Sequence, residues 1–371
     1  MIRFSEKLLH WYDQKTRGPM PWRGEKDLYR VWLSEVMLQQ TQVETVIPYY
    51  QRWLQQYPTV KAVAKASQDD ILKSWEGLGY YARARNFHAA CQQVEKEHGG
   101  KIPETPEEFS KLKGIGSYTL AAVQSIALNR PLPAIDGNVK RVVARLKRMK
   151  EAPSKALLAI ETFLKSTISH DRPGDFNQAM MDLGATICKS TVAKCDRCPV
   201  KKFCGAFKCR EVHLYPVLEE KPFKPHYKIA VGIVWKGERV LITKRKAHGL
   251  LGGLWEFPGG KIKEGETAKH CAKREVKEEV GVMVQPLSSV GTIKHVYTHF
   301  SIEMEGILCR YVRGQPKTLD CADWKWINFS NISSYAFPKA NHKLFPLIPK
   351  IPNGPKISPK EPINRKVAKA C

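Results

Sequence analysis

The first half of the chain carries apolar residues at three- and four-residue steps, which is the spacing of amphipathic helices. Strand-like alternation is nearly absent from this half. Five segments show the helical pattern: 30–56, 69–77, 84–98, 156–169 and 176–188. We therefore predict that residues 1–212 form an all-helical domain.

The pattern changes after Leu214. Residues 213–226 hold several prolines and alternating charges, which is typical of a linker. Beyond them the segments 228–235, 238–245 and 299–312 alternate like strands, and 267–280 has helical spacing. The sequence therefore predicts a multidomain fold, with the all-α domain followed by an α/β domain over residues 227–350. Residues 351–371 are polar and basic, and we expect them to form a disordered tail.

The chain is strongly basic, with 61 Lys and Arg against 36 Asp and Glu and a formal net charge of +25. Both predicted domains share this charge, which favours a polyanionic partner over a charge that serves solubility alone. Charge does not distinguish DNA from RNA or a membrane surface. No apolar run approaches the roughly 20 residues that span a bilayer, and the first residues lack a cleavage-type signal. We expect a cytoplasmic, monomeric protein of a bacterium-like cell, associated with the nucleoid and not with a membrane.

Four of the ten cysteines lie close together. Because the sequence shows no secretory signal, we do not expect a disulfide framework. Cys188, Cys195, Cys198 and Cys204 follow the pattern C-x6-C-x2-C-x5-C. Thiolates at this spacing can surround one iron–sulfur cluster, whereas zinc sites more often show two C-x2-C pairs. We expect an iron–sulfur cluster, with zinc as the alternative, that stiffens a basic loop.

A glycine-containing turn precedes a helix at 112–123, LKGIGSYTLAAV. Gly114 and Gly116 would let backbone amides and the start of the helix face a DNA phosphate. Many turns have this form, so the motif is weak alone. Its position matters, because Asp136 follows about twenty residues later.

Asp136 directly precedes a basic helix and has two interpretations. It is an N-cap, or it is an ionised carboxylate that stabilises the positive charge formed as a glycosidic bond breaks. One residue can fill both roles.

Glu35 is the second candidate carboxylate. Its helical neighbours are Val31, Trp32 and Leu38, so it lies on an apolar face. Burial there would raise its pKa and suit it to donating a proton to a leaving base. The alternative is a structural glutamate with satisfied hydrogen bonds.

The order of these motifs resembles the endonuclease III-like DNA glycosylases, which carry a helix-hairpin-helix, a catalytic Asp and this cysteine pattern. Four stretches are similar to adenine glycosylases of the MutY type: SEVMLQQTQV (34–43), GLGYYARARN (77–86), AIDGNVKRV (134–142) and FNQAMMDLGA (176–185). The resemblance covers about residues 1–212. It implies a 4Fe-4S cluster and hydrolytic removal of adenine paired with 8-oxoguanine or guanine in double-stranded DNA.

The resemblance also implies roles for single residues. Glu35 would protonate the adenine and help activate water, while Asp136, supported by Asn138, would stabilise the sugar cation. Tyr118 occupies the hairpin position where lyase-type relatives carry a Schiff-base lysine, which implies excision without strand cleavage.

Five further residues match DNA-contacting positions of these relatives. Gln40 and Tyr80 would insert into the duplex beside the lesion and offset the cost of flipping the base. Trp22, Arg23 and Leu38 would form the wall of the adenine pocket. Without the resemblance, the aromatic members would be ordinary core residues.

The second domain carries a complete Nudix box at 260–282, G-x5-E-x7-R-E-U-x-E-E-x-G-U. Adenine glycosylases usually lack an intact box in this domain, which reads 8-oxoguanine. Glu275, Glu278 and Glu279 are spaced to share one helical face and would hold magnesium on a pyrophosphate.

Further residues of this domain resemble hydrolases that cleave 8-oxo-dGTP. Asn341 falls where those enzymes read the oxidised guanine, and Arg245 lies where they contact the nucleotide. Tyr297, Thr298 and His299 lie where adenine glycosylases keep a Phe-Ser-His loop for 8-oxoguanine in DNA.

Three interpretations of this domain stay open: recognition of 8-oxoguanine in DNA, additional magnesium-dependent hydrolysis of 8-oxo-dGTP, or a generic Nudix pyrophosphatase. For the whole chain, a non-catalytic DNA damage-binding protein is the remaining class. Such a binder has no need for both Glu35 and Asp136, and the chain has both.

Overall fold

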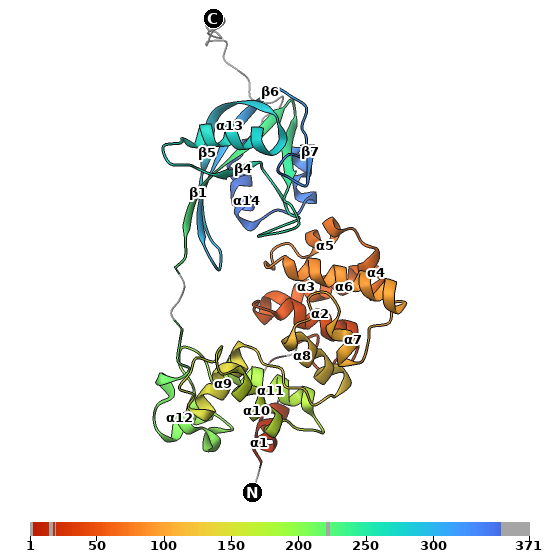
Figure 1. The fold of residues 1–371 in the computed structure, drawn as a ribbon, viewed down its shortest axis with the longest axis vertical. Helices are drawn as coiled ribbons and strands as arrows, with labels where there is room; N and C mark the ends of the chain where they lie inside the picture. The colour runs from red at the N-terminus through yellow and green to blue at the C-terminus, as the bar shows by residue number, and fades with distance from the viewer. Residues whose placement is uncertain (1–2, 15–17, 19, 220–222, 350–371) are drawn as a thin grey trace, which may run out of the picture. The chain divides into compact units, whose positions relative to one another are not determined.

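The computed structural model describes residues 3–14, 18, 20–219 and 223–349. The chain divides into two compact units, Met1–Pro222 and Phe223–Cys371, and each has its own core (Figure 1). The domain bounds predicted from the sequence stay predictions, and the predicted tail at 351–371 lies outside the described residues. No described helix is both long and apolar enough to cross a membrane.

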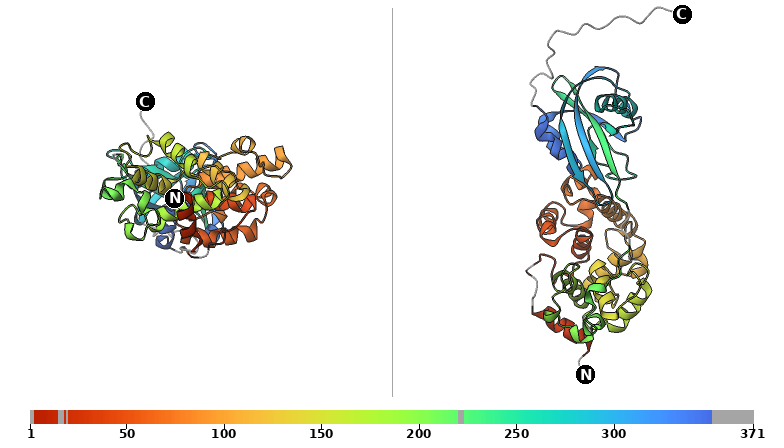
Figure 2. Two further views of the ribbon diagram at one scale, coloured as in Figure 1. Left: turned by 90° about the horizontal axis from the view of Figure 1, so that it is seen from below. Right: turned by 90° about the vertical axis from the view of Figure 1, so that its left-hand side faces the viewer.

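The first unit is helical, as the sequence predicts. Its α-helices are α1 (Phe4–Asp13), α2 (Leu28–Leu38), α3 (Val43–Gln56), α4 (Val60–Lys65), α5 (Gln68–Ser74), α6 (Ala82–His98), α7 (Pro106–Ser110), α8 (Ser117–Leu128), α9 (Gly137–Lys147), α10 (Leu157–Thr167), α11 (Pro173–Thr186) and α12 (Gly205–Lys208). They pack in two groups, visible in Figure 2, which meet where α8 and α9 pack against α11.

The helices α2 to α7 pack around aromatic side chains. Trp32 lies edge-on to Phe87, with ring centroids 4.7 Å apart, and Trp53 packs edge-on to Trp75 at 5.6 Å. Each of these side chains is fully or almost fully buried. Such T-shaped contacts add to the hydrophobic stabilisation of the core.

The helices α1, α9, α10 and α11 form a second core. Phe4, Leu8, Val143 and Phe176 belong to it, and the half-buried cysteines Cys188, Cys198 and Cys204 pack against it. The cysteine loop is therefore anchored on the same core that positions α9.

The second unit is an α/β domain, as predicted. Its strands are β1 (His226–Lys236), β2 (Arg239–Lys244), β3 (Trp255–Glu256), β4 (Gly259–Lys261), β5 (Met283–Val296), β6 (Ser301–Arg313) and β7 (Asp323–Asn328). They form one mixed sheet in the order β3-β2-β1-β6-β5, where β4 pairs with β1 and β7 pairs with β2. Strands β1 and β6 run parallel, and the other pairs are antiparallel.

Helices cover both faces of this sheet. Alternate residues of a strand point to opposite faces, so Ala230 and Val234 of β1 pack with α13 (Ala268–Val280), while Val231 and Ile233 pack with α14 (Lys339–Leu344). Figure 1 shows α13 lying across the sheet. Strands β3, β4, β5 and β7 are missing from the sequence prediction. Strands β3 and β4 have only two and three residues, and in β5 Pro286 and register shifts on either side of Ser289 interrupt the alternation.

Candidate active site

Glu35 lies in the middle of α2 and is 5% exposed. The Tyr118 hydroxyl donates a hydrogen bond of 2.7 Å to its Oε2. Burial, and to a smaller extent the charge of Asp136, raise the pKa of Glu35 to about 7, although the Tyr118 hydrogen bond and Arg23 act in the opposite direction. A sizeable fraction of Glu35 is therefore protonated near neutral pH, as a proton donor requires.

Tyr118 stands in the first turn of α8. Its hydroxyl also lies 3.7 Å from Sδ of Met181 on α11. Burial raises the pKa of Tyr118 well above its usual value. The side chain is thus a neutral phenol that donates to Glu35.

Asp136 is the N-cap of α9. Its Oδ1 accepts from the backbone N–H of Val139 at 2.7 Å, and its Oδ2 accepts from Nδ2 of Asn138 at 2.9 Å. The cap that the sequence suggests is therefore present. A Cβ at Gly184 would lie 2.5 Å from Cβ of Asn138, so glycine allows α11 to approach this side chain closely. Both carboxylate oxygens are thereby held in one orientation.

Arg141 connects Asp136 to the cysteine loop, and no sequence inference named it. Its Nη2 donates to Oδ1 of Asn138 and to the Gly184 carbonyl, each at 2.8 Å. Its Nε donates to the Cys188 carbonyl at 2.8 Å. The sequence feature that could have pointed to Arg141 is its position one turn after Asn138, on the helix that Asp136 caps.

The four motif cysteines line one small cavity together with Arg145 and Lys201. The buried Arg145 donates from Nη1 to Sγ of Cys188 at 3.2 Å. Four thiols and a buried guanidinium fit an anionic thiolate-bound cluster, because the guanidinium offsets negative charge. In the described part of the chain, no group of three or more His, Cys, Asp or Glu side chains stands in metal-binding geometry.

Of the three predicted pocket-wall residues, Trp22 is buried, whereas Leu38 and Arg23 are partly exposed. Trp22 is 6% exposed and packs edge-on against Tyr50, with centroids 5.3 Å apart. Leu38 is half-buried at the end of α2. The Arg23 side chain is 26% exposed and forms an ion pair with Asp182 at 2.7 Å.

The two predicted wedge residues sit on turns with unusual backbone conformations. Gln40 has a φ of 56° and Tyr80 a φ of 48°, in the left-handed region that few side chains adopt. The buried Arg83 links the two turns. Its guanidinium donates to the carbonyls of residues 36, 37 and 39 in the first turn and of residues 78 and 79 in the second. Sequence reasoning missed Arg83, although its spacing from Phe87 and Val94 places it on the apolar face of α6.

The two hairpin glycines, Gly114 and Gly116, differ in whether the structure requires a glycine at their position. Gly114 has a φ of +80°, and a Cβ there would lie 2.6 Å from Cβ of Asn86. Gly116 is the N-cap of α8, and nothing lies within 4 Å of its Cβ position. Both residues are exposed, so the backbone of this turn is open to a phosphate.

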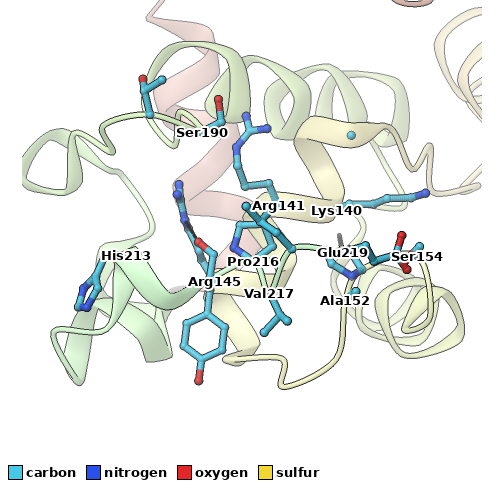
Figure 3. A pocket seen from close by; sticks show the side chains of 15 residues that line it. Lys140, Arg141, Arg145, Ala152, Ser154, Ser190, His213, Pro216, Val217 and Glu219 are labelled. Carbon is cyan, nitrogen blue, oxygen red and sulfur yellow. Dashed lines mark hydrogen bonds between the residues drawn. The ribbon is translucent and has the colours of Figure 1, made fainter. Parts of the chain in front are cut away.

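A basic cavity of about 470 Å³ lies at the start of α9 (Figure 3). Gly137, directly after Asp136, lines it, and Lys140, Arg141 and Arg145 contribute positive charge. Ser190 and Thr191 of the cysteine loop line another side. The cavity therefore places cations and hydroxyl groups next to the N-terminal end of the helix that Asp136 caps.

The carboxylates of the Nudix box gather around Arg274 on α13. Its guanidinium forms ion pairs with Glu266 at 2.8 Å, Glu275 at 2.6 Å and Glu278 at 3.0 Å. A Cβ at Gly260 would collide with the Glu275 carboxyl at 2.4 Å, which explains the glycine at that position of the box.

Glu279 stands apart from this group because it is buried. It accepts hydrogen bonds from Oγ1 of Thr243 at 3.0 Å and from the backbone N–H of Gly259 at 2.8 Å. Burial, together with the nearby charge of Glu256, raises its pKa to about 8.

The predicted guanine-reading residues lie on neighbouring segments. Asn341 on α14 is 4% exposed, and its Oδ1 has no hydrogen-bond partner in the described structure. Tyr297 stacks on Phe300 with centroids 4.7 Å apart, while Thr298 and His299 are exposed between β5 and β6. A backbone hydrogen bond from Ala340 links Tyr297 to the residue next to Asn341. Arg245 pairs with Glu256 through two contacts of 2.8 Å.

Two family models match the chain. Residues 33–165 match the HhH-GPD superfamily base excision DNA repair protein, and residues 230–347 match a NUDIX domain. The helical fold, the hairpin, the buried acid and the capped aspartate define a base excision DNA repair protein of the HhH-GPD superfamily with a NUDIX domain after it.

Comparison with whole proteins identifies the family. The chain is 31% identical to the adenine DNA glycosylase of Rattus norvegicus, over 92% of this chain and 77% of that protein. It is 33% identical to the adenine DNA glycosylase of Buchnera aphidicola subsp. Acyrthosiphon pisum, over 92% and 96%. A solved thermostable thymine-DNA glycosylase aligns with a TM-score of 0.51 at 25% identity, over 56% of this chain and 95% of that one. The chain belongs to the adenine DNA glycosylases.

Proposed function

We propose that the protein hydrolyses the N-glycosidic bond of adenine paired with 8-oxoguanine, or with guanine, in double-stranded DNA. The observation that carries this proposal is the buried Glu35, hydrogen-bonded to Tyr118 and close enough to the capped Asp136 for their charges to interact. We further propose that it works as a monomer on chromosomal DNA in the cytoplasm.

In the proposed reaction, protonated Glu35 donates its proton to the adenine ring. The bond between the base nitrogen and the sugar C1′ then breaks, and the bonding electrons leave with the base. The ionised Asp136, held by its cap hydrogen bond and by Asn138, stabilises the positive charge on the sugar. Water adds to C1′, and Glu35 recovers a proton from that water.

Several features of the helical unit support DNA binding. The exposed Gly114–Gly116 backbone faces a phosphate, and the basic cavity beside α9 offers Lys140 to another. Gln40 and Tyr80 stand on turns that Arg83 fixes, which suits side chains that enter a duplex.

A duplex with adenine opposite 8-oxoguanine tests this proposal under single-turnover conditions. We expect the wild-type chain to release adenine and leave an alkali-labile site in an otherwise intact strand. Glu35→Gln and Asp136→Asn should each slow release by at least about 100-fold, the usual range for a proton donor or an electrostatic stabiliser. Intact adenine after incubation with the wild-type protein would contradict the proposal.

We propose that Cys188, Cys195, Cys198 and Cys204 hold one 4Fe-4S cluster. The cavity that they line and the guanidinium of Arg145 at Cys188 support this assignment. When bound, the cluster would supply structural cross-linking of the basic loop. The Arg141 bridge then connects that loop to Asn138 and Asp136.

We propose that the second unit reads the 8-oxoguanine opposite the adenine, through Tyr297, Thr298, His299 and Asn341. The buried Oδ1 of Asn341, which lacks a partner, supports this role because a ligand donor would satisfy it. Hydrolysis of 8-oxo-dGTP, with Mg²⁺ on Glu275, Glu278 and Glu279, is the alternative for the same unit.

An assay with 8-oxo-dGTP and Mg²⁺ separates these alternatives. Recognition alone predicts no release of pyrophosphate by the wild-type chain. Turnover that Glu275→Gln abolishes would establish hydrolysis, and turnover unchanged by that substitution would point to a contaminating enzyme. Calorimetric titration with Mn²⁺ provides a second measurement of the metal site that does not depend on activity.

A further inference from the structure

Arg23 is held on several sides by residues to which the sequence analysis gave no role of their own. Its Nη2 donates to Oδ2 of Asp182 at 2.7 Å, and its Nη1 donates to Oε1 of Gln178 at 3.0 Å. The Tyr12 hydroxyl accepts from the same Nη1, and the Tyr12 ring centroid lies 5.1 Å from the guanidinium carbon. Asp182 is only 4% exposed. A buried carboxylate needs a partner of opposite charge, so the pair is a fixed part of the unit.

The Arg23 guanidinium also acts on Glu35. The groups that influence the Glu35 carboxyl are Tyr118 from α8, Asp136 from the cap of α9 and Arg23 from the turn before α2. The remaining neighbours of Glu35 on α2 are apolar. Arg23 is therefore the one cation among these groups, and its positive charge favours the ionised form of Glu35. A guanidinium without a counter-charge would draw Glu35 away from the protonated form that excision requires.

We propose that Asp182 is a positioning residue for excision: it fixes the Arg23 guanidinium and offsets the charge of Arg23 at Glu35. This inference rests on the proposed role of Glu35 as proton donor. Helix α11 then supports the acid from two sides, because Met181 contacts the Tyr118 hydroxyl and Asp182 binds Arg23.

The pH dependence of single-turnover excision tests this inference. Protonated Glu35 is lost as the pH rises through its pKa, so the rate should fall on the alkaline side. Asp182→Asn removes the negative charge that offsets Arg23. The alkaline fall of the rate, called the alkaline limb below, should therefore move to lower pH. Arg23→Gln removes the cation that favours ionised Glu35 and should move the alkaline limb to higher pH. Each shift should be on the order of one pH unit, because a unit charge a few ångströms away changes a pKa by about that amount.

The double variant Arg23→Gln/Asp182→Asn removes both charges, and its alkaline limb should return close to that of the wild type. Asp182→Glu restores the charge and should restore the limb. Loss of stability alone would not produce opposite shifts that cancel, so the pattern separates positioning from a general structural defect. If Asp182→Asn does not fold, Arg23→Gln and the double variant still test the prediction.

Asp175→Asn is the matched control, because Asp175 lies on the same helix and pairs with Arg172 at the surface. Its alkaline limb should stay at the wild-type position. Shifts in the same direction for Arg23→Gln and Asp182→Asn, or no shift in either, would overturn the inference. If the limb persists in Glu35→Gln, the proposed role of Glu35 itself fails, and this outcome is distinct from the previous one.

Discussion

At the scale of single residues, the two carboxyl groups proposed to act in excision lie in different surroundings. Glu35 sits on an apolar helix face, where burial disfavours its charge. Asp136 sits at the start of α9, where a backbone N–H and the Asn138 amide bind its oxygens. Burial thus favours the protonated form of Glu35, while the cap contacts fix the orientation of the Asp136 carboxylate.

Tyr118→Phe tests how the hydrogen bond to Glu35 contributes. The phenol lowers the pKa of Glu35, so its removal should raise that pKa and move the alkaline limb of the excision rate to higher pH. Loss of orientation should also lower the maximal rate by roughly 10-fold, the value of about one hydrogen bond to a charged or charge-developing group. Single-turnover rates measured across the alkaline range provide the check. A limb that moves to lower pH would contradict this account.

The sequence pointed to both acids and, through the resemblance, to Asn138 beside Asp136, but not to the contacts that Tyr118 and Asp182 make. Glu35 and Asp136 have recognisable settings, an apolar helix face and a helix start. Tyr118 bonds Glu35 from 83 positions along the chain, and Asp182 meets Arg23 from 159 positions away. No periodicity or spacing encodes such contacts, because they arise only when α8 and α11 pack beside α2.

At the scale of elements, turns position the DNA-binding parts of the helical unit. The hairpin before α8 requires glycine at one position and tolerates a side chain at the other. The sequence suggested both glycines as phosphate contacts. In the structure, only Gly114 has a backbone conformation and a close neighbour that require glycine. Similarly, the apolar pattern over 30–56 runs through a turn at Gln40 that divides α2 from α3.

Gly114→Ala should destabilise the hairpin. A side chain at a φ of +80° is strained by about 1 kcal/mol, and the contact with Asn86 adds to that. We expect a lower Tm and weaker duplex binding, measured by thermal unfolding and fluorescence anisotropy. Gly116→Ala is the matched control, since its Cβ position is open, and its effect should be clearly smaller. Equal losses in the two variants would show that steric demand at Gly114 is not the cause.

Cys198→Ser should remove the proposed cluster. The visible absorbance of iron–sulfur charge transfer should disappear, and the helical unit should lose thermal stability, because the cysteines pack on the core of α1, α9, α10 and α11. The exposed Cys209 serves as control, and Cys209→Ser should retain both iron and stability. Full retention of iron in Cys198→Ser would remove this cysteine from the ligand set.

At the scale of the whole molecule, the chain has two units with separate cores, and we propose that each reads one base of the pair. The helical unit carries the acid chemistry, and the NUDIX unit carries the residues proposed to read the opposite base. Fold class and family followed from the sequence, because the motifs are local and continuous. Strand β5 and the Arg141 bridge did not, since one has an interrupted alternation and the other joins distant segments.

Tyr297→Ala should reduce discrimination rather than chemistry. Stacking of a base on an aromatic ring contributes about 1–3 kcal/mol, so excision opposite 8-oxoguanine should fall by roughly 10-fold relative to excision opposite guanine. The ratio of the two rates is the measurement. Tyr311→Ala, near the opposite end of β6, should leave the ratio unchanged. An unaltered ratio in Tyr297→Ala would remove this ring from the recognition of 8-oxoguanine.

The phenol of Tyr118 also bears on the DNA product that the proposed reaction leaves. A phenol cannot form the imine through which an amine opens the sugar and breaks the phosphodiester chain. The proposed product is therefore a continuous strand with a reactive aldehyde sugar at the emptied position. A different class of reaction, phosphodiester hydrolysis beside that sugar, has to follow before a correct nucleotide can be inserted. With a tyrosine in place of an amine at position 118, base removal and strand cleavage would require two separate enzymes.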